Sequence, residues 1–238
     1  MTTKNFFIAV VPARKNSKGI KNKNLLYYKG DRIVNLAISV GLKLKFIDKV
    51  ILSTDSEKII KISNKYHKKI MIIKRKKSLS LDQTPMHPVL KDAVVKYESK
   101  YNKKVSGVII LDPTSPLRKK IDIYKCYKKF SSNKVDLVLT VHESEANPYF
   151  SVVEKNKKYF KLVKGNALNL GSRQVAPNVY TINTICWIYS RNSIVKSNLR
   201  IPKKTLIQKI DLKNSLELNT ILDKKRLIAY EKNNNKQN

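Results

Sequence analysis

Short apolar runs alternate with amphipathic stretches along the first 141 residues, and this alternation limits the possible folds more than any other feature. The runs are rich in β-branched residues and are bounded by polar or Pro residues, which is typical of buried strands. The stretches between them place apolar residues at helical spacing, as Ile33, Leu36, Ala37 and Val40 do. The sequence therefore predicts strands at 6–11, 49–53, 70–73, 107–111 and 135–141, and helices at 31–45, 57–66, 86–97 and 119–130.

Five repeats of this kind indicate βαβ units, which build a mainly parallel sheet with helices on its faces, a Rossmann-like α/β fold. Ligands in such folds bind at the carboxyl ends of the strands. The polar loops at 13–24, 54–56, 74–84 and 112–118 all fall on that edge. We therefore expect the functional site there.

The alternation changes at about 145–180, where two short runs, 150–153 and 159–163, flank the Lys-rich turn EKNKKYF. This pattern predicts a β-hairpin or lid inserted into the domain. An exposed insertion of this kind is a candidate dimer contact.

A strand at 181–189 and a helix at 215–230 complete the predicted fold. A chain of 238 residues is long enough for one domain with a sizeable core. We expect a single domain over 1–230, which contains the insertion lobe, and a frayed tail at 231–238.

The chain carries no recognisable secretion signal, and no stretch approaches the ~20 apolar residues of a membrane span. Cys126 and Cys186 form no CxxC pair, so neither a disulfide framework nor a zinc site is expected. These observations favour a cytoplasmic protein without a membrane contact.

Lysine dominates the charge of the chain, which has a formal net charge of +33 and 50 Lys and Arg residues, 42 of them Lys. The lysines occur in every segment instead of gathering on one arm, and no nucleic-acid-binding motif accompanies them. We therefore expect no specific nucleic-acid partner. Since Lys is the default cation here, a retained Arg indicates a place that needs a planar, bidentate donor.

The loop at 13–24, ARKNSKGIKNKN, follows the first strand and carries five cations. It contains neither a P-loop nor a GxGxxG pattern. Arg14, Lys18 and Lys23 are nevertheless suited to neutralising phosphate oxygens, and Gly19 permits a positive φ. The loop favours a triphosphate site, with an ordinary solvated loop as the alternative.

Four segments in order resemble the acylneuraminate cytidylyltransferase family, the CMP-sialic acid synthetases. RKNSKGI followed by KN at 14–24 resembles the RxGSKGIxxKN signature of that family, and LDPTSPLR at 111–118 is similar to its LQPTSPLR. VILSTDSEKI at 50–59 and SRQVAPNVYTINTICWIY at 172–189 resemble two further family segments. The resemblance covers about residues 6–225.

This resemblance implies a three-layer α/β/α nucleotidyltransferase that uses CTP and Mg²⁺ to form a CMP-nonulosonic acid and pyrophosphate. It also implies a homodimer, whose contact is built largely by the inserted hairpin. By position, the triphosphate-binding residues would be Arg14, Ser17, Lys18 and Lys23; the other nucleotide contacts Asn24, Arg75 and Asp112; and the sugar-binding residues Arg118, Arg173, Gln174 and Tyr180.

The metal site is where the chain departs from the family. The late DID motif reads KID at 209–211, and Asp112 stands where Gln is common. We expect Asp112 and Asp211 to hold Mg²⁺, with Lys209 on a phosphate and with Arg14, Lys23 and Asp211 as the catalytic residues. The alternative is that Asp112 only caps its own turn.

Other functions stay open at this point. Sialic, legionaminic and pseudaminic acids are not distinguished by the sequence. A different acceptor (Kdo, a phosphonate or a phosphorylated metabolite), GTP in place of CTP, a degenerate nucleotide-binding paralogue, and a nucleic-acid binder acting through charge alone are the competing hypotheses.

Overall fold

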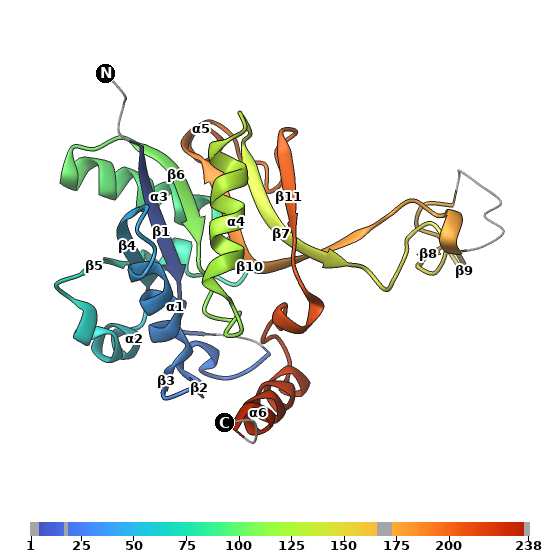
Figure 1. The fold of residues 1–238 in the computed structure, drawn as a ribbon, viewed down its shortest axis with the longest axis horizontal. Helices are drawn as coiled ribbons and strands as arrows, with labels where there is room; N and C mark the ends of the chain where they lie inside the picture. The colour runs from blue at the N-terminus through green and yellow to red at the C-terminus, as the bar shows by residue number, and fades with distance from the viewer. Residues whose placement is uncertain (1–4, 17–18, 166–172, 236–238) are drawn as a thin grey trace.

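A seven-stranded sheet forms the centre of the protein in a computed structural model that describes residues 5–16, 19–165 and 173–235 (Figure 1). The strands lie in the order β11-β7-β10-β6-β1-β4-β5. Their bounds are β1 Phe6–Pro12, β4 Ile47–Thr54, β5 Ile70–Lys74, β6 Val105–Ile110, β7 Leu137–Glu143, β10 Tyr180–Ser190 and β11 Thr205–Lys209.

The sheet is mainly parallel. β1 pairs in parallel with β4 and β6, β4 with β5, and β7 with β11, whereas β10 runs antiparallel to β6 and β7. The pairing of β10 with β7 is irregular between Ile182 and Trp187. This irregularity lies beside the carboxyl end of β6, so it shapes the edge where a ligand is expected.

Helices cover both faces of the sheet. Ala9 and Val11 of β1 belong to one core cluster and Ile8 and Val10 to the other, and all four side chains are fully buried. The alternation of β1 side chains therefore divides the core into two layers. Helices α1 Ile33–Leu42, α2 Glu57–Ile62 and α4 Lys120–Ser131 pack on the first face, and α3 Met86–Tyr101 and α5 Arg191–Lys196 on the second. The three-layer prediction is confirmed.

A third apolar cluster joins the two ends of the chain below the sheet. Ile20 from the opening loop and Tyr28 pack with Leu218 and with Leu227 of helix α6 Ile221–Asn235. A small hairpin, β2 Tyr27–Tyr28 and β3 Asp31–Arg32, connects the opening loop to α1. The C-terminal segment thus lies directly under the opening loop.

An arm projects from the body beyond β7 and β10 (Figure 1). It ends in an antiparallel hairpin, β8 Val153–Asn156 and β9 Tyr159–Leu162, so the predicted insertion is present with slightly shifted strands. Tyr159 and Phe160 are 67% and 68% exposed. The arm therefore carries large apolar side chains that its own chain leaves uncovered.

Sequence patterns missed several short elements. β11, the β2–β3 hairpin and α5 were not predicted, because each is too short to show a period. The helix expected at 215–230 begins only at Ile221, since the residues before it pass through the short 3-10 turn Leu212–Asn214 and then run without regular structure. It continues to Asn235, so 231–235 is helical.

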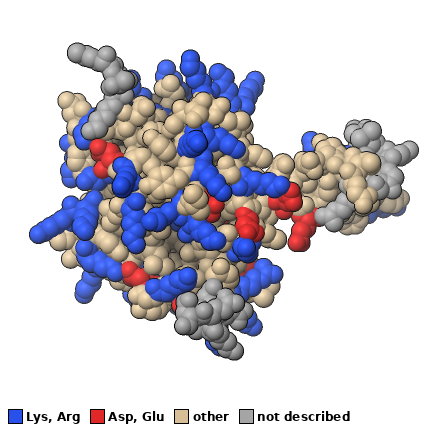
Figure 2. All heavy atoms as spheres, in the orientation of Figure 1, with Lys and Arg blue, Asp and Glu red and all other residues tan. Residues whose placement is uncertain are grey.

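Lys and Arg side chains are scattered over the whole visible face, on the body and beside the arm (Figure 2). No single basic stripe stands out in this view. Among the described residues, no helix combines the length and apolar character that a membrane crossing requires.

Gly107 of β6 provides a test of the packing. A Cβ at this position would lie 2.4 Å from Cε1 of Phe7, whose ring is held edge-on by Phe46, Tyr127 and Phe130. Since that ring has no room to move, Gly107→Ala should lower the free energy of unfolding by about 1–3 kcal/mol in urea denaturation. Ser106→Ala on the same strand, where the hydroxyl bonds only exposed Asn5, is the control. Equal midpoints for the two variants would contradict this packing.

Candidate active site

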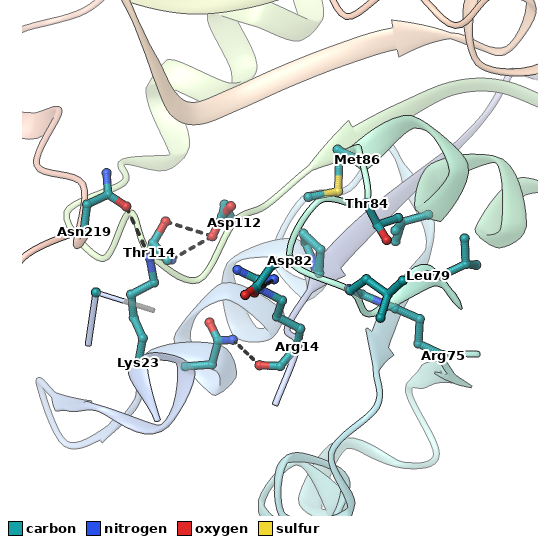
Figure 3. Close-up of a pocket in the computed structure, with 15 residues that line it drawn as sticks. Arg14, Lys23, Arg75, Leu79, Asp82, Thr84, Met86, Asp112, Thr114 and Asn219 are labelled. Atoms are coloured by element: carbon teal, nitrogen blue, oxygen red, sulfur yellow. Dashed lines mark hydrogen bonds and ion pairs between the residues drawn. The ribbon is translucent and has the colours of Figure 1, made fainter. Parts of the chain in front are cut away.

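A cleft of about 360 Å³ lies at the carboxyl edge of the sheet, where the sequence places the polar loops (Figure 3). Its residues come from the ends of β1, β5 and β6, from the opening loop, from the loop before α3 and from the segment before α6. The polar and charged residues that line it are Arg14, Lys23, Asn24, Arg75, Asp82, Thr84, Asp112, Thr114 and Asn219.

Hydrogen bonds to β4 and its following loop fix the start of the opening loop. The backbone N–H of Ala13 donates to the Ser53 carbonyl at 2.9 Å, and that of Lys15 donates to Oδ1 of Asp55 at 2.7 Å. Buried Asn24 donates from Nδ2 to the Arg14 carbonyl at 3.0 Å. Asn24 is therefore used to hold the loop closed.

The sequence analysis expected Gly19 to provide a positive φ, and this expectation was wrong. The described left-handed residue of this loop is Asn22, with φ 56°, and Gly19 is not left-handed. A Cβ on Gly19 would lie 2.0 Å from the carbonyl oxygen of Asn219. Gly19 is required because two backbone segments meet there, one from each end of the chain.

Arg14 and Arg75 enter the cleft in different environments. Nη1 of Arg14 pairs with Oδ1 of Asp82 at 2.5 Å, and both side chains are partly exposed. Arg75 is buried and donates to Ser53, from Nε to Oγ at 3.2 Å and from Nη2 to the carbonyl at 2.8 Å. Burial lowers the pKa of Arg75, which is offset in part by Asp55. Arg75 is thus fixed, whereas Arg14 is held by a partner that a stronger anion could replace.

Lys23 stands between the opening loop and two carboxylates. Nζ donates to Oδ1 of Asn219 at 3.2 Å. Burial lowers the pKa of Lys23, and the charges of Asp112 and Glu217 act against that shift. A partly desolvated ammonium beside this cleft would gain from a phosphate oxygen that replaces its lost water.

Asp112 caps its own turn, as the simpler of the two hypotheses held. Oδ1 accepts from the backbone N–H of Thr114 at 3.0 Å and from its hydroxyl at 2.9 Å. These bonds fix the carboxylate at the end of β6, facing Lys23 and Asn219 (Figure 3). No described residue donates a hydrogen bond to Oδ2, so capping leaves that oxygen available for a ligand.

Glu217, which the sequence analysis did not single out, lies near Asp112 but lines a neighbouring hollow with Leu117 and His142. Burial raises its pKa, and the nearby charge of Asp112 raises it further, while hydrogen bonds from Asn219 and Thr184 act in the opposite direction. Glu217 and Asn219 flank the fully buried Leu218, so the two polar side chains share one side of an extended segment. The same alternation was visible in the sequence, but the predicted helix from 215 concealed it.

The residues expected from the KID segment are not brought into the cleft. Asp211 pairs with Lys213 at 3.1 Å, and its side chain is 53% exposed. Lys209 pairs with Glu143 at the base of the arm and is also exposed. The charge of Asp112 acts on Glu217, whereas Asp211 follows the end of β11 and is held by Lys213.

Arg118, which the sequence analysis expected on the sugar side of the cleft, is bonded to the protein backbone. Its guanidinium donates to three backbone carbonyls: Ile185 at 2.5 Å, Asp112 at 2.7 Å and Thr184 at 3.1 Å. Burial of the guanidinium lowers the pKa of Arg118 to about 10, and Asp112 partly offsets this shift. Arg118 thus joins the end of β6 to the irregular part of β10.

The remaining expected site residues lie elsewhere. Gln174 lines a separate hollow with Glu143 and Asn147, and Tyr180 is a half-exposed residue at the start of β10. Arg173 begins a 3-10 turn on the arm. Ser17 and Lys18 fall outside the described residues.

Comparison with known proteins identifies the family to which this site belongs. A family model described as cytidylyltransferase matches residues 8–233. The chain belongs to the cytidylyltransferase family. The resemblance seen in the four sequence segments is therefore confirmed over nearly the whole chain.

Curated relatives in this family match most of the chain. It is 30% identical to "Post-translational flagellin modification protein B" of Campylobacter coli, over 95% of this chain and 96% of that protein. It is also 30% identical to "CMP-N,N'-diacetyllegionaminic acid synthase" of Campylobacter jejuni, over 91% of each chain. Identity to "N-acylneuraminate cytidylyltransferase" of Streptococcus agalactiae is 27%, over 90% of this chain and 50% of that one.

Solved structures support the same cytidylyltransferase fold. A CMP:2-keto-3-deoxy-manno-octonic acid synthetase complexed with CTP aligns over 96% of this chain and 99% of its own, with a TM-score of 0.66 at 15% identity. A 4-diphosphocytidyl-2C-methyl-D-erythritol synthase from Anaerococcus prevotii aligns over 95% and 96%, with a TM-score of 0.63 at 15% identity.

The raised pKa of Glu217 gives a stability prediction. Because its folded pKa lies above the ordinary value of 4.5, the charged carboxylate destabilises the ligand-free protein above that pH and has no such effect below it. Glu217→Gln should therefore raise the free energy of unfolding at pH 7 by about 0.5–1 kcal/mol. Denaturant midpoints measured from pH 7 to pH 4 check this, and the gain should shrink as the pH falls. Glu57→Gln on exposed α2 is the control, and a gain independent of pH would contradict the assignment.

Proposed function

We propose that this chain transfers CMP from CTP to the anomeric hydroxyl of a nonulosonic acid and releases pyrophosphate. The observation that carries this proposal is the convergence of three cations, Arg14, Lys23 and Arg75, on a cleft that also contains Asp112. Membership of the cytidylyltransferase family gives the reaction class. The names of the Campylobacter and Streptococcus relatives support a nonulosonic acid as the acceptor.

The cleft suits a reaction that needs positioning and charge neutralisation. The acceptor hydroxyl attacks the α-phosphorus in line while pyrophosphate leaves, so no covalent nucleophile is required. Arg14 and Lys23 would neutralise the charge on the leaving pyrophosphate. To bind the triphosphate, Arg14 would leave Asp82 and pair with a phosphate oxygen instead. Arg75 and Asn24 stay in our proposal as residues beside the nucleoside.

The carboxylates of the site fit Mg²⁺. Asp112 and Glu217 are close enough for the charge of one to raise the pKa of the other, and both offer the oxygen donors that this ion prefers. No group of three or more acidic, His or Cys side chains suited to a metal occurs among the described residues, and Mg²⁺ in such enzymes is completed by water and substrate phosphates. Bound Mg²⁺ would neutralise triphosphate charge next to the reacting phosphorus. We therefore propose Glu217, in place of Asp211, as the partner of Asp112.

A homodimer would bring the remaining predicted residues to the cleft. Arg173 and Gln174 lie on the arm, which projects away from the body of its own chain, and Tyr180 lies at its base (Figure 1). The exposed Tyr159 and Phe160 of the hairpin favour contact with a second copy. We propose that the arm of one protomer covers the acceptor side of its partner's cleft. Because CTP is a cytoplasmic metabolite, the reaction would take place in the cytoplasm.

The competing function of a degenerate nucleotide-binding paralogue loses its main support. That hypothesis rested on the replacement of one metal-binding aspartate by Lys209. Lys209 lies at the arm, and Glu217 is near enough to Asp112 for the charge of Asp112 to raise its pKa. In our proposal Asp112 and Glu217 therefore supply the two carboxylates.

Pyrophosphate release with Mg²⁺ tests the proposed function. CTP, GTP, UTP and ATP are each combined with a panel of nonulosonic acids, Kdo, and a control without acid. We expect turnover with CTP and a nonulosonic acid, at least about tenfold faster than with the other nucleotides. A base other than cytosine would leave buried polar groups of the site without hydrogen-bond partners. Release that needs no acid, or needs Kdo alone, would contradict the proposal.

Carboxylate variants test the metal assignment. Asp112→Asn and Glu217→Gln should each lower kcat by about 100- to 1000-fold, since each removes charge beside the reacting phosphate. Asp211→Asn should stay within about a factor of two, because its exposed ion pair with Lys213 contributes little. The readout is the Mg²⁺ dependence of turnover, with folding checked by circular dichroism. A large loss in Asp211→Asn with little loss in Glu217→Gln would restore the pair expected from the sequence.

A further inference from the structure

A second cavity of about 360 Å³ adjoins the cleft. It lies between α3, β6, β10 and the segment 197–204, and it shares Asp112 and Met86 with the cleft. In Figure 3, Met86 lies on the opposite side of Asp112 from Lys23 and Asn219. The two cavities therefore meet at the carboxylate beside which transfer is proposed, and Met86 of the second cavity lies on the side of Asp112 away from Lys23.

The wall of this second cavity is apolar and well fixed. Its largest members are Trp187, Tyr189, Leu90 and Ile110, all less than 10% exposed. The indole Nε1 donates to the Asn183 carbonyl at 2.7 Å. Because Nε1 is already hydrogen-bonded, the indole of Trp187 presents mainly apolar surface to a ligand in the cavity.

Tyr189 and His87 are fixed in the same way. The Tyr189 hydroxyl donates to the Arg200 carbonyl at 2.6 Å, and Nε2 of His87 lies 2.9 Å from the Ser193 carbonyl. Their rings meet edge to face, with centroids 5.8 Å apart. The wall is thus preformed, and its hydrogen-bonding groups are used by the protein itself.

The rim carries the polar groups. The exposed guanidinium of Arg200 lies over the Trp187 ring, 5.4 Å from the ring centre, and Asn198 and Thr184 are its neighbours on the lining. This arrangement suits an occupant with an apolar body and a few carbonyl or carboxylate oxygens at its edge. It does not suit a triphosphate, because Arg200 is the one Lys or Arg side chain among the residues that line this cavity.

We infer that this second cavity is an acceptor subsite that takes the acylamido and methyl substituents of the acid, with Arg200 donating to an oxygen at its rim. The inference rests on the proposed function and deepens it, because it names the acceptor class. An in-line attack at the α-phosphorus requires the acceptor on the side opposite the leaving pyrophosphate. Met86 of the second cavity lies on that side of Asp112, away from Lys23.

The chemistry of the wall then selects among nonulosonic acids. A side chain with methyl and acylamido groups places apolar surface against Trp187, Tyr189 and Leu90. A side chain with free hydroxyl groups would lose water there and find few partners, because the polar atoms of the wall are already paired. The preferred acceptor is therefore a diacylated, deoxygenated acid.

The fluorescence of Trp187 reports directly on this subsite, because the chain contains one Trp. The probes are N,N'-diacetyllegionaminic acid and N-acetylneuraminic acid, each added with Mg²⁺ and a CTP analogue that carries a methylene bridge between the α- and β-phosphorus. This analogue binds without transferring CMP. We expect the diacylated acid to change the emission of Trp187 and the analogue alone to leave it nearly unchanged.

Turnover supplies the second readout. With CTP, kcat/KM should be at least about tenfold higher for the diacylated acid than for N-acetylneuraminic acid, because apolar groups replace hydroxyls that would be buried unpaired. Arg200→Met should raise the KM for the diacylated acid by about tenfold and leave the KM for CTP within about a factor of two. The matched control is Ile121→Gln, at an exposed position of α4, which should change neither constant.

The outcomes separate this inference from the proposed function. No pyrophosphate release with CTP and any acid would overturn both. Turnover of the diacylated acid without a change in Trp187 emission would overturn the subsite alone. So would a kcat/KM for N-acetylneuraminic acid equal to or above that for the diacylated acid. If the KM for the diacylated acid is unchanged in Arg200→Met, Arg200 does not bind the acid at the rim.

Discussion

One buried guanidinium holds the two halves of the site together. Arg118 bonds the carbonyls of Asp112, Thr184 and Ile185, so the end of β6 and the irregular part of β10 share a single donor. Burying such a group is tolerated only when its donors are satisfied, and three carbonyls supply that satisfaction. The position of Asp112 follows, and with it the boundary between the cleft and the cavity beside Trp187. A lysine could not replace Arg118, because its ammonium lacks the planar, forked donors that reach all three carbonyls.

Because the chain is so basic, acidic residues that lie close together near the cleft need a physical explanation. The chain has 17 acidic residues against 50 basic ones, yet Asp82 and Asp112 line one cleft and Glu217 lies nearby. Asp82 balances Arg14, whereas the charge of Asp112 raises the pKa of Glu217. The ligand-free site therefore holds a local electrostatic conflict inside a cation-rich protein. A divalent cation and a triphosphate together would relieve it, because each supplies the charge that the other side lacks.

The sequence was sufficient for the α/β class, the five early strands, the inserted hairpin and the placement of Arg14, Lys23, Arg75 and Asp112 at one edge, because long periodic segments and strand-end loops carry strong local signals. It did not single out Glu217, because the helix predicted from 215 concealed the alternation there and the KID segment directed the metal prediction to Asp211. The bonds of Arg118 to backbone carbonyls were not predicted either, because such bonds leave no local sequence pattern. Contacts between residues almost 200 positions apart are set by the packing of the whole fold.

The contact of Gly19 with the Asn219 carbonyl has a consequence for synthesis of the chain. Lys23 and Asn219, which bond across the cleft, are 196 positions apart. The opening loop leaves the ribosome long before the backbone and the apolar residues of α6 on which it rests. The geometry of the cleft therefore cannot form in a nascent chain that stops before α6, and a ribosome that stalls there would produce a folded sheet with an unfinished site.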